Sequence, residues 1–310
     1  MAEIKILLLC NNTIAIPALL EMLFFKQLAA VVIPQKNTGL AADLEELMKG
    51  TGVPLLTVDR KNFKKIIRRE MEEKKAAAVL MMTFPYIIPA DLLEVPPKGF
   101  INFHYGKLPE YRGPEPIFSQ VMQQEQNPGL TVHVVTTGVD DGPVILQESL
   151  SYDADDTYGQ LQHKLAESGA RLVRLLLKIL SFGSVLPSVP QDESLAAYHK
   201  KPTMAILMIN WQKMDSSAIK ALVNACNPWN KGAGTIINNR QIGITEVEIT
   251  GTCEPGHTAG EIIFCDRQNG LVVATSDNKK IRINIIYTNE GFFSGSRLSQ
   301  FQVKAGDSFA

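Results

Sequence analysis

The chain has 310 residues, of which 45% are hydrophobic and 20% are charged, and its formal net charge is −1. This composition is typical of a globular protein and excludes a disordered chain, and the length favours two domains because single cores rarely grow this large. No apolar run approaches the roughly 20 residues that a membrane helix needs, and residues 1–10 lack the features of a secretory signal. We therefore expect a cytoplasmic protein.

The spacing of the cysteines indicates no metal centre. The four cysteines, Cys10, Cys226, Cys253 and Cys265, include no Cys-x-x-Cys pair, and no paired histidines accompany them. Zinc sites and disulfide frameworks both depend on such spacing. We therefore expect small buried thiols in a reducing compartment and no bound metal.

The first part of the chain alternates strand-like and helix-like patterns. Short apolar runs predict buried strands, and apolar residues at every third or fourth position predict helices. The expected strands are residues 4–9, 28–33 and 77–81, and the expected helices are residues 14–24, 40–49 and 63–74. This alternation predicts an α/β fold with a Rossmann-like, mostly parallel sheet. The first turn has no Gly-x-Gly-x-x-Gly pattern, so NAD binding is not predicted.

Three more strands and a long helix follow. Residues 99–103, 130–135 and 144–150 are strand-like runs, and residues 157–182 predict a helix with one apolar side. The apolar residues expected on that side are Leu161, Leu165, Leu172, Leu175, Leu176 and Ile179. The two later strands flank a turn-rich loop, so we expect that loop to lie beside the sheet.

The periodic pattern breaks after the long helix, where Pro187 and Pro190 stand among small polar residues. We predict a catalytic domain at residues 1–183, a linker at residues 184–204 and a second domain at residues 205–310. The second domain is expected to contain one helix and then short strands, and a small β-barrel is the simplest closure. The expected elements are a helix at residues 216–226 and strands at residues 240–249, 260–264, 271–274 and 281–286.

Polar residues that can carry chemistry gather around the strand at residues 99–103. Asn102 and His104 share one side of it because side chains alternate along a strand. His104 stands at its carboxyl end, the edge where open α/β sheets bind ligands. A carboxylate follows in Gly-Val-Asp-Asp-Gly, residues 138–142. An amide, an imidazole and a carboxylate could therefore meet at one point.

Residues 99–116 read Gly-Phe-Ile-Asn-Phe-His-Tyr-Gly-Lys-Leu-Pro-Glu-Tyr-Arg-Gly-Pro-Glu-Pro. Together with residues 138–142, this segment resembles the folate-dependent formyltransferases, which carry Asn-x-His-x-x-x-Leu-Pro-x-x-Arg-Gly and a later Asp-x-Gly. In order and length the chain is most similar to methionyl-tRNA formyltransferases and their small-molecule relatives, which include sugar-nucleotide N-formyltransferases and the hydrolase domain of formyltetrahydrofolate dehydrogenase. The resemblance covers nearly the whole chain. It implies the formyltransferase fold, with a smaller C-terminal, OB-like β-barrel.

The resemblance also implies the catalytic residues. In formyl transfer from 10-formyltetrahydrofolate, an amine attacks the formyl carbon, negative charge grows on the formyl oxygen, and a proton leaves the amine. Asn102 and a protonated His104 can donate hydrogen bonds to that oxygen. Asp140 can pair with the imidazolium and order a water that removes the proton, and the family spacing selects it over Asp141. No motif position matches His133, His163, His199 or His257, so we expect structural roles for them.

By the same resemblance, two segments would enclose the folate and two residues would face the acceptor. The expected folate-binding residues are Phe84, Tyr86, Ile87, Ile88, Thr136, Thr137, Gly138 and Val139. The expected acceptor-side residues are Arg112 and Tyr105. Arg112 could either orient an anionic acceptor or tie down its own loop, and the sequence does not separate the two interpretations.

The charge pattern favours a small or carrier-borne amine as the acceptor. Enzymes that formylate tRNA need basic surface, but the loop at residues 34–39 is short and nearly uncharged, and residues 205–310 hold ten basic and nine acidic residues. The basic residues at 61–69 lie beside Glu70, Glu72 and Glu73, which indicates a solvated helix face. The alternatives are methionyl-tRNA as acceptor, a formyltetrahydrofolate hydrolase, and a binding module without catalysis. The sequence leaves the oligomeric state open.

Overall fold

The computed structural model describes residues 4–182 and 185–310. The chain divides into two compact units. Unit 1 comprises Met1–Pro116, Asn127–Ser151 and Gln162–His199, and unit 2 comprises Ile117–Gln126, Tyr152–Leu161 and Lys200–Ala310. The predicted boundary between residues 183 and 184 lies outside the described residues, so the division into 1–183, 184–204 and 205–310 stays a prediction.

Unit 1 is built on a seven-stranded sheet in the order β3-β2-β1-β4-β5-β6-β7. Its strands are β1 (Ile6–Cys10), β2 (Leu28–Pro34), β3 (Leu55–Val58), β4 (Ala78–Met82), β5 (Phe100–His104), β6 (Gly129–Val134) and β7 (Val144–Ser149). The pairings from β3 through β5 are parallel, whereas β6 and β7 add antiparallel strands at one side. The predicted Rossmann-like, mostly parallel sheet is confirmed.

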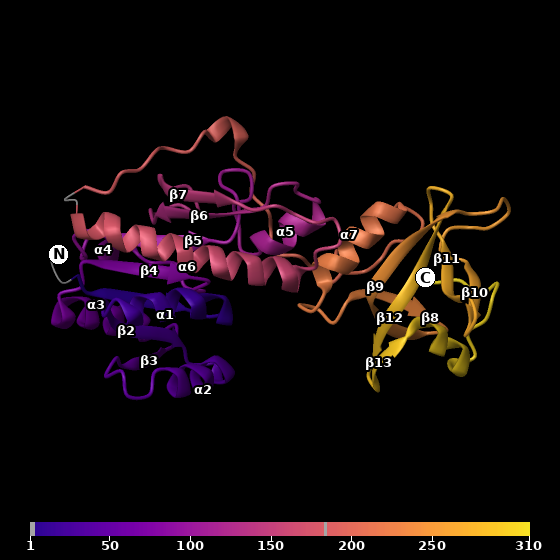
Figure 1. The fold of residues 1–310 in the computed structure, drawn as a ribbon, viewed down its shortest axis with the longest axis horizontal. Helices are drawn as coiled ribbons and strands as arrows, with labels where there is room; N and C mark the ends of the chain where they lie inside the picture. Colours follow the sequence, from indigo (N-terminus) through magenta and orange to yellow (C-terminus); the bar gives the residue numbers. More distant parts are fainter. Residues whose placement is uncertain (1–3, 183–184) are drawn as a thin grey trace. The chain divides into compact units, whose positions relative to one another are not determined.

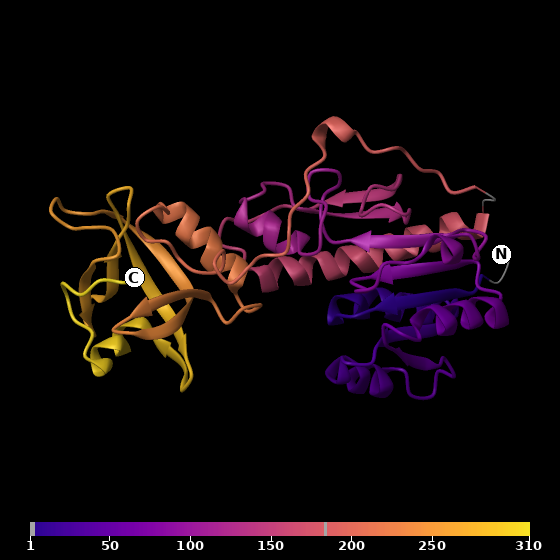
Figure 2. The ribbon, with the colours of Figure 1, turned by 180° about the vertical axis from the view of Figure 1, so that it is seen from behind.

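Helices cover both faces of this sheet (Figures 1 and 2). They are α1 (Ile16–Phe24), preceded by the 3-10 turn η1 (Thr13–Ala15), α2 (Thr38–Leu47), α3 (Phe63–Lys74), α4 (Ala90–Leu93) and α6 (Tyr158–Phe182). On one face, Leu7 and Leu9 of β1 pack with Ile67 of α3 in a buried cluster. Burying such a side chain contributes about 1.5–3 kcal/mol. In α6, Leu161, Leu165, Leu172 and Leu176 are buried as predicted, but Leu175 is 47% exposed because it lies at the edge of the apolar stripe.

Unit 2 contains a helix and an antiparallel sheet in the order β10-β11-β12-β9-β8, with β13 paired to β12. The helix is α7 (Ser216–Cys226), and α5 (Pro116–Met122) lies almost wholly in this unit. The strands are β8 (Ala233–Ile237), β9 (Arg240–Thr252), β10 (Ile262–Asp266), β11 (Gly270–Ala274), β12 (Lys279–Thr288) and β13 (Gly291–Ser294), and the 3-10 turn η3 (Gly295–Phe301) follows them. Another 3-10 turn, η2 (Glu193–Leu195), belongs to unit 1. The predicted smaller, strand-rich domain is confirmed.

The core of unit 2 is anchored by Trp211, which is fully buried. Its ring stacks on Phe309 with centroids 5.1 Å apart, and its indole N–H donates to the Thr235 hydroxyl over 2.9 Å. The hydrogen bond satisfies the one polar atom that burial of a tryptophan removes from water. Among the described residues of both units, none forms a helix that is long and apolar enough to cross a membrane.

Candidate active site

The candidate site is built on β5, whose neighbours in the sheet are β4 and β6. Asn102 is half-buried and His104 is 5% exposed, and both belong to the same side of the strand. The antiparallel register of β6 pairs Asn102 with His133 and His104 with Thr131. β6 therefore delivers a second imidazole to the two polar residues that the sequence predicts.

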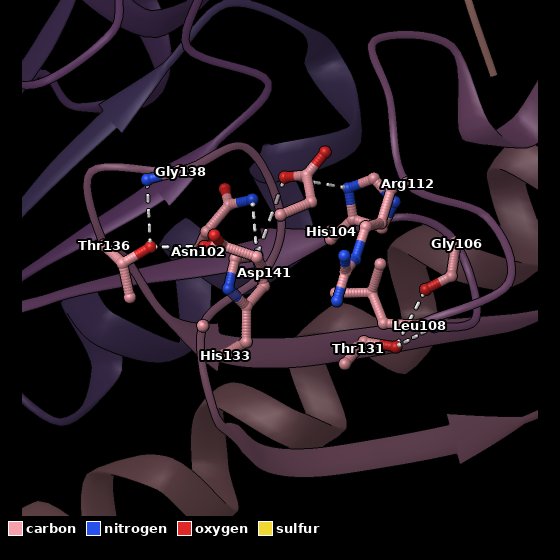
Figure 3. A network of polar contacts seen from close by, with 12 residues as sticks. Asn102, His104, Gly106, Leu108, Arg112, Thr131, His133, Thr136, Gly138 and Asp141 are labelled. Atoms are coloured by element: carbon pink, nitrogen blue, oxygen red, sulfur yellow. Dashed lines mark hydrogen bonds and ion pairs between the residues drawn. The ribbon is translucent and has the colours of Figure 1, made fainter. Parts of the chain in front are cut away.

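His133 and Asn102 contact each other directly (Figure 3). The Asn102 side-chain nitrogen lies 3.2 Å from His133 Nε2, and His133 Nδ1 lies 2.9 Å from the Val134 carbonyl oxygen. A carbonyl can only accept, so we assign the proton to Nδ1, and Nε2 then accepts from the Asn102 amide. Burial and the neighbouring His104 lower the pKa of His133 to about 4. A neutral His133 thus fixes which way the Asn102 amide faces.

His104 is held between a carbonyl and a carboxylate. Its Nε2 lies 2.7 Å from the Tyr111 carbonyl oxygen, and its Nδ1 lies 3.5 Å from Asp140 Oδ1. With the Nε2 proton donated to Tyr111, a second proton on Nδ1 would make an imidazolium that faces the carboxylate. The 3.5 Å separation is an ion-pair distance and too long for a tight hydrogen bond.

Asp140 has an unusual backbone and an unevenly satisfied carboxylate. Its φ of +54° is uncommon outside glycine, although aspartate tolerates it better than most residues. Oδ2 accepts the Gly113 backbone N–H over 3.0 Å, while Oδ1 lies 3.5 Å from His104 and 3.7 Å from His133. One oxygen is therefore fixed by the backbone, and the other faces two imidazoles.

Asp141 makes its side-chain contacts within its own loop, between β6 and β7 (Figure 3). Its carboxylate accepts a hydrogen bond from the Thr136 hydroxyl, which in turn accepts the Gly138 backbone N–H over 3.2 Å. These contacts close the loop on itself. The two neighbouring aspartates thus have different contacts, and the catalytic role of Asp140 stays a prediction.

The acceptor-side predictions fare differently. The Arg112 guanidinium contacts Gln191 and both carboxylate oxygens of Glu193, and its side chain is mostly buried. Hydrogen bonding to Glu193 raises the pKa of Arg112. Tyr105 is buried, and burial together with Cys10 raises its pKa well above the usual range. The geometry favours Arg112 as a residue that ties down its loop, and Tyr105 as a packing residue.

The predicted folate-binding residues split between core and surface. Ile88 is 3% exposed and belongs to the core cluster, against which Phe84 and Tyr86 also pack, whereas Ile87 is 78% exposed. In the second segment, Thr136 is half-buried and residues 137–139 are exposed. The large apolar side chains presented to solvent are thus Ile87 and Val139. Folate binding by these residues stays a prediction.

A cavity of about 660 Å³ lies elsewhere, within unit 2. Its lining includes Lys231, Arg240, Tyr287, Glu290 and Phe301. Lys231 lies over the Tyr287 ring and Arg240 over the Phe301 ring. The two imidazoles and the carboxylate described above all belong to unit 1, whereas this cavity belongs to unit 2. We therefore assign the chemistry to the polar residues around Asn102 and none to this cavity.

Comparison with known proteins identifies the family. The sequence model described as formyl transferase matches residues 26–176, and that of the formyl transferase C-terminal domain matches residues 204–291. The chain belongs to the formyl transferase family. The predicted enzyme class, a formyltransferase, is thereby confirmed.

Curated relatives carry the name methionyl-tRNA formyltransferase. The protein of that name from Carboxydothermus hydrogenoformans is 34% identical over 69% of this chain and 68% of its own length. One from Ruminiclostridium cellulolyticum is 30% identical over 88% of each chain. Among solved structures, an N-formyltransferase from Helicobacter canadensis, in complex with folinic acid and dTDP-3-aminofucose, covers 90% of this chain and 98% of its own, with a TM-score of 0.69 and 19% identity. At that identity the structural likeness supports the fold alone.

Proposed function

We propose that this formyltransferase moves the formyl group of 10-formyltetrahydrofolate onto a primary amine of a small or carrier-borne molecule, such as an amino sugar nucleotide or a natural-product precursor. The observation that carries the proposal is the Asn102–His133–Asp140–His104 cluster, in which each residue lies 3.2–3.7 Å from the next one in this order. An oxyanion donor and a proton carrier are the two groups that formyl transfer needs.

Each residue has a defined part in the reaction. The amine nitrogen attacks the formyl carbon, and the carbonyl electron pair moves onto oxygen, where the Asn102 amide and an imidazolium proton of His104 stabilise it. Asp140 Oδ1, through a water, takes the proton that the amine loses. The oxyanion electron pair then re-forms the carbonyl, the carbon–N10 bond breaks with its electron pair passing to N10, and N10 takes up the proton that the water and Asp140 accepted from the amine. The 3.5 Å separation between His104 and Asp140 leaves the Nδ1 proton without a tight hydrogen bond, so it can also donate to the formyl oxygen.

The donor fits the surface residues that the sequence predicts. A pterin is a flat ring system with polar edges, and such ligands bind between apolar side chains and backbone polar groups. Ile87 and Val139 are large apolar side chains that the fold leaves exposed, and the backbone of residues 136–139 supplies polar groups. Folinic acid in the Helicobacter canadensis structure supports a folate donor in this fold.

The acceptor proposal depends on charge. The loop after β2 is pinned close to the sheet, because the Asn37 side chain donates to the Asn11 carbonyl over 2.8 Å and accepts the Leu40 N–H. On α3, Arg68 is paired with Asp91 and Arg69 with Glu70, which removes two cations from a phosphate-binding surface. Both observations favour a small acceptor.

Methionyl-tRNA is the second candidate acceptor, and the names of the relatives at 30–34% identity favour it. The two acceptors differ in their dependence on salt. A protein that neutralises several phosphates loses about 10³-fold or more in affinity between 50 and 200 mM salt. A small acceptor would show a far shallower slope.

The test is release of tetrahydrofolate and formation of the formylated product. The reactions contain no acceptor, a panel of amino sugar nucleotides and amino acids, or charged initiator tRNA. Release that requires a small amine supports the proposal, release that requires tRNA supports the second candidate, and release without any acceptor identifies a hydrolase. His104→Ala should abolish release, while His163→Ala, at an exposed histidine paired with Glu167 on α6, serves as the matched control.

A further inference from the structure

A segment far along the chain packs against the Asp140 loop. Residues 185–199, here called the strap, belong to unit 1 and follow α6. Val189 and Val144 exchange two backbone hydrogen bonds of 2.8 and 2.9 Å at the edge of β7. Further along, Ala197 and His199 pair with the backbone of Arg112, and the His199 ring stacks on Tyr111 at 5.3 Å. The strap is thus fixed at two places, at Val189 and at residues 197–199.

Between these anchors, the Gln191 side chain reaches the backbone of the Asp140 loop. Its amide nitrogen donates to the Asp140 carbonyl over 2.8 Å and to the Gly142 carbonyl over 2.8 Å. Its amide oxygen accepts from Arg112 Nε over 3.1 Å and from Arg112 Nη2 over 2.8 Å. Both hydrogens and both acceptor positions of the amide are used.

We propose that Gln191 is a positioning residue that sets the backbone of Asp140 and so aims its carboxylate at His104. This inference rests on the proposed role of Asp140 in formyl transfer. Asp140 has a left-handed backbone, a conformation that costs about 1–3 kcal/mol and persists only where surrounding contacts impose it. Gln191 supplies such contacts on both sides of Asp141, at Asp140 and at Gly142.

Glutamine suits this position better than its close analogues. Glutamate would set carboxylate oxygens against two carbonyl oxygens, and leucine would leave both carbonyls and the Arg112 donors without their partner. Arg112 orients Gln191 and is itself held by Glu193. In this chain of contacts, Arg112 acts on the Asp140 loop only through Gln191.

The experiment compares Gln191→Leu with the parent in two ways. In the first, hydrogen exchange of the peptide covering residues 136–143 is measured without substrate. In Gln191→Leu this peptide should exchange at least about tenfold faster, because its carbonyls lose two hydrogen bonds that hold the loop and the loop then opens more often. In the second, steady-state kinetics should show kcat reduced about 10- to 100-fold with KM for the donor changed less than about threefold. Gln212→Leu removes an amide that donates to the Ala259 carbonyl in unit 2 and should change neither readout.

A double-mutant cycle tests whether Gln191 acts through Asp140. Adding Gln191→Leu to Asp140→Asn should cost less than about threefold further activity, because the aimed carboxylate is already gone. Unchanged exchange in Gln191→Leu, or fully additive losses in the cycle, would overturn the inference. A parent protein that transfers no formyl group would instead refute the proposed function, and the exchange measurement would still decide whether Gln191 holds the loop.

Discussion

Two aspartates, Asp140 in unit 1 and Asp277 in unit 2, show how the same side chain is put to different uses. Asp277 accepts from the Ser216 backbone over 3.1 Å, from the Ser216 hydroxyl over 2.8 Å and from the Thr275 hydroxyl over 2.7 Å, and it pairs with Lys279 at 3.3 Å. Asp140 accepts one backbone hydrogen bond, and its other oxygen faces two imidazoles beyond hydrogen-bond distance.

The difference separates a structural carboxylate from the one to which we assign the proton transfer in the proposed function. Burial raises the pKa of Asp277, but the hydrogen bonds from Thr275 and Ser216 outweigh that effect and lower it to about 2. Its contacts fix the first residue of α7 and complement the positive end of the helix. Asp140 is more buried, at 14% side-chain exposure against 25%, and yet has fewer donors. The Oδ1 atom of Asp140 keeps acceptor capacity for a proton, as the role proposed for it requires.

The largest expected effect is on turnover. Asp140→Asn should reduce kcat by roughly 10²- to 10⁴-fold, because the variant keeps an acceptor for Gly113 but can neither remove a proton nor pair with the imidazolium. The melting temperature should change little. Initial rates and thermal unfolding of the same preparation check both statements. If turnover stayed within a few-fold of the parent, Asp140 would not be catalytic, and its sparse hydrogen bonding relative to Asp277 would have no functional meaning.

The next effect concerns the donor that holds Asp140. A Cβ added at Gly113 would lie 2.1 Å from the His199 carbonyl oxygen, and its φ of +124° is strained for any other residue. Gly113→Ala should therefore destabilise the protein by on the order of 3 kcal/mol and lower activity. Denaturant unfolding measures the loss. Gly50→Ala is the control, since Gly50 also has a positive φ but open space around it. If both variants lost the same free energy of unfolding, the close approach of Gly113 to the His199 carbonyl oxygen would not be what requires glycine at position 113.

The third prediction concerns His133, which stands against the same carboxylate. Because the pKa of His133 is lower in the folded protein, the unfolded chain takes up the proton at a higher pH. The contribution of neutral His133 to the free energy of unfolding is therefore fully present above about pH 6.5 and declines as the pH falls toward 4. Between pH 7.5 and pH 5 the decline should be about 2 kcal/mol. His133→Gln should remove most of it, whereas His163→Gln should not. Unfolding curves at the two pH values test this, and an unchanged pH response in His133→Gln would contradict it.

The smallest effect belongs to the structural aspartate. Asp277→Asn should lower stability at pH 7 by about 1–2 kcal/mol, a figure discounted for solvent screening, and leave kcat unchanged. Because the folded pKa is depressed, the contribution is fully present above about pH 4 and is lost as the pH falls through about 2. The gap between parent and variant in unfolding free energy should close over that window. A loss of activity comparable to that of Asp140→Asn would erase the distinction between the two residues.

Some features followed from local pattern. The helices at residues 63–74 and 216–226 have the predicted bounds, and Asn102 and His104 share a strand face as alternation requires. Short elements such as β3, β13 and α4 were not predicted, because four residues hold too little periodicity to be distinguished from a loop. Their existence depends on neighbours that are distant in sequence.

The site shows the same limit. His133 matches no motif and enters the cluster only because the antiparallel register of β6 sets it opposite Asn102. The sequence does place His133 and Thr131 on the same face of a predicted strand. It does not show which residues of the neighbouring strand they oppose, because pairing register depends on both strands. Gln191 lies 51 residues from Asp140, in a segment whose sequence suggests only a linker.

The sequence by itself determined the family resemblance and the alternation of the longer strands and helices, because these depend on residue identity and spacing along the chain, and the same spacing selected Asp140 as the proposed catalytic carboxylate. Only the tertiary structure decided that His133 orients Asn102, that Arg112 is tied to Glu193, and that Gln191 holds the Asp140 backbone. Each of these contacts joins strands or loops whose pairing is set by the packing of the whole unit, and a hydrogen bond exists only where packing brings donor and acceptor within about 3 Å.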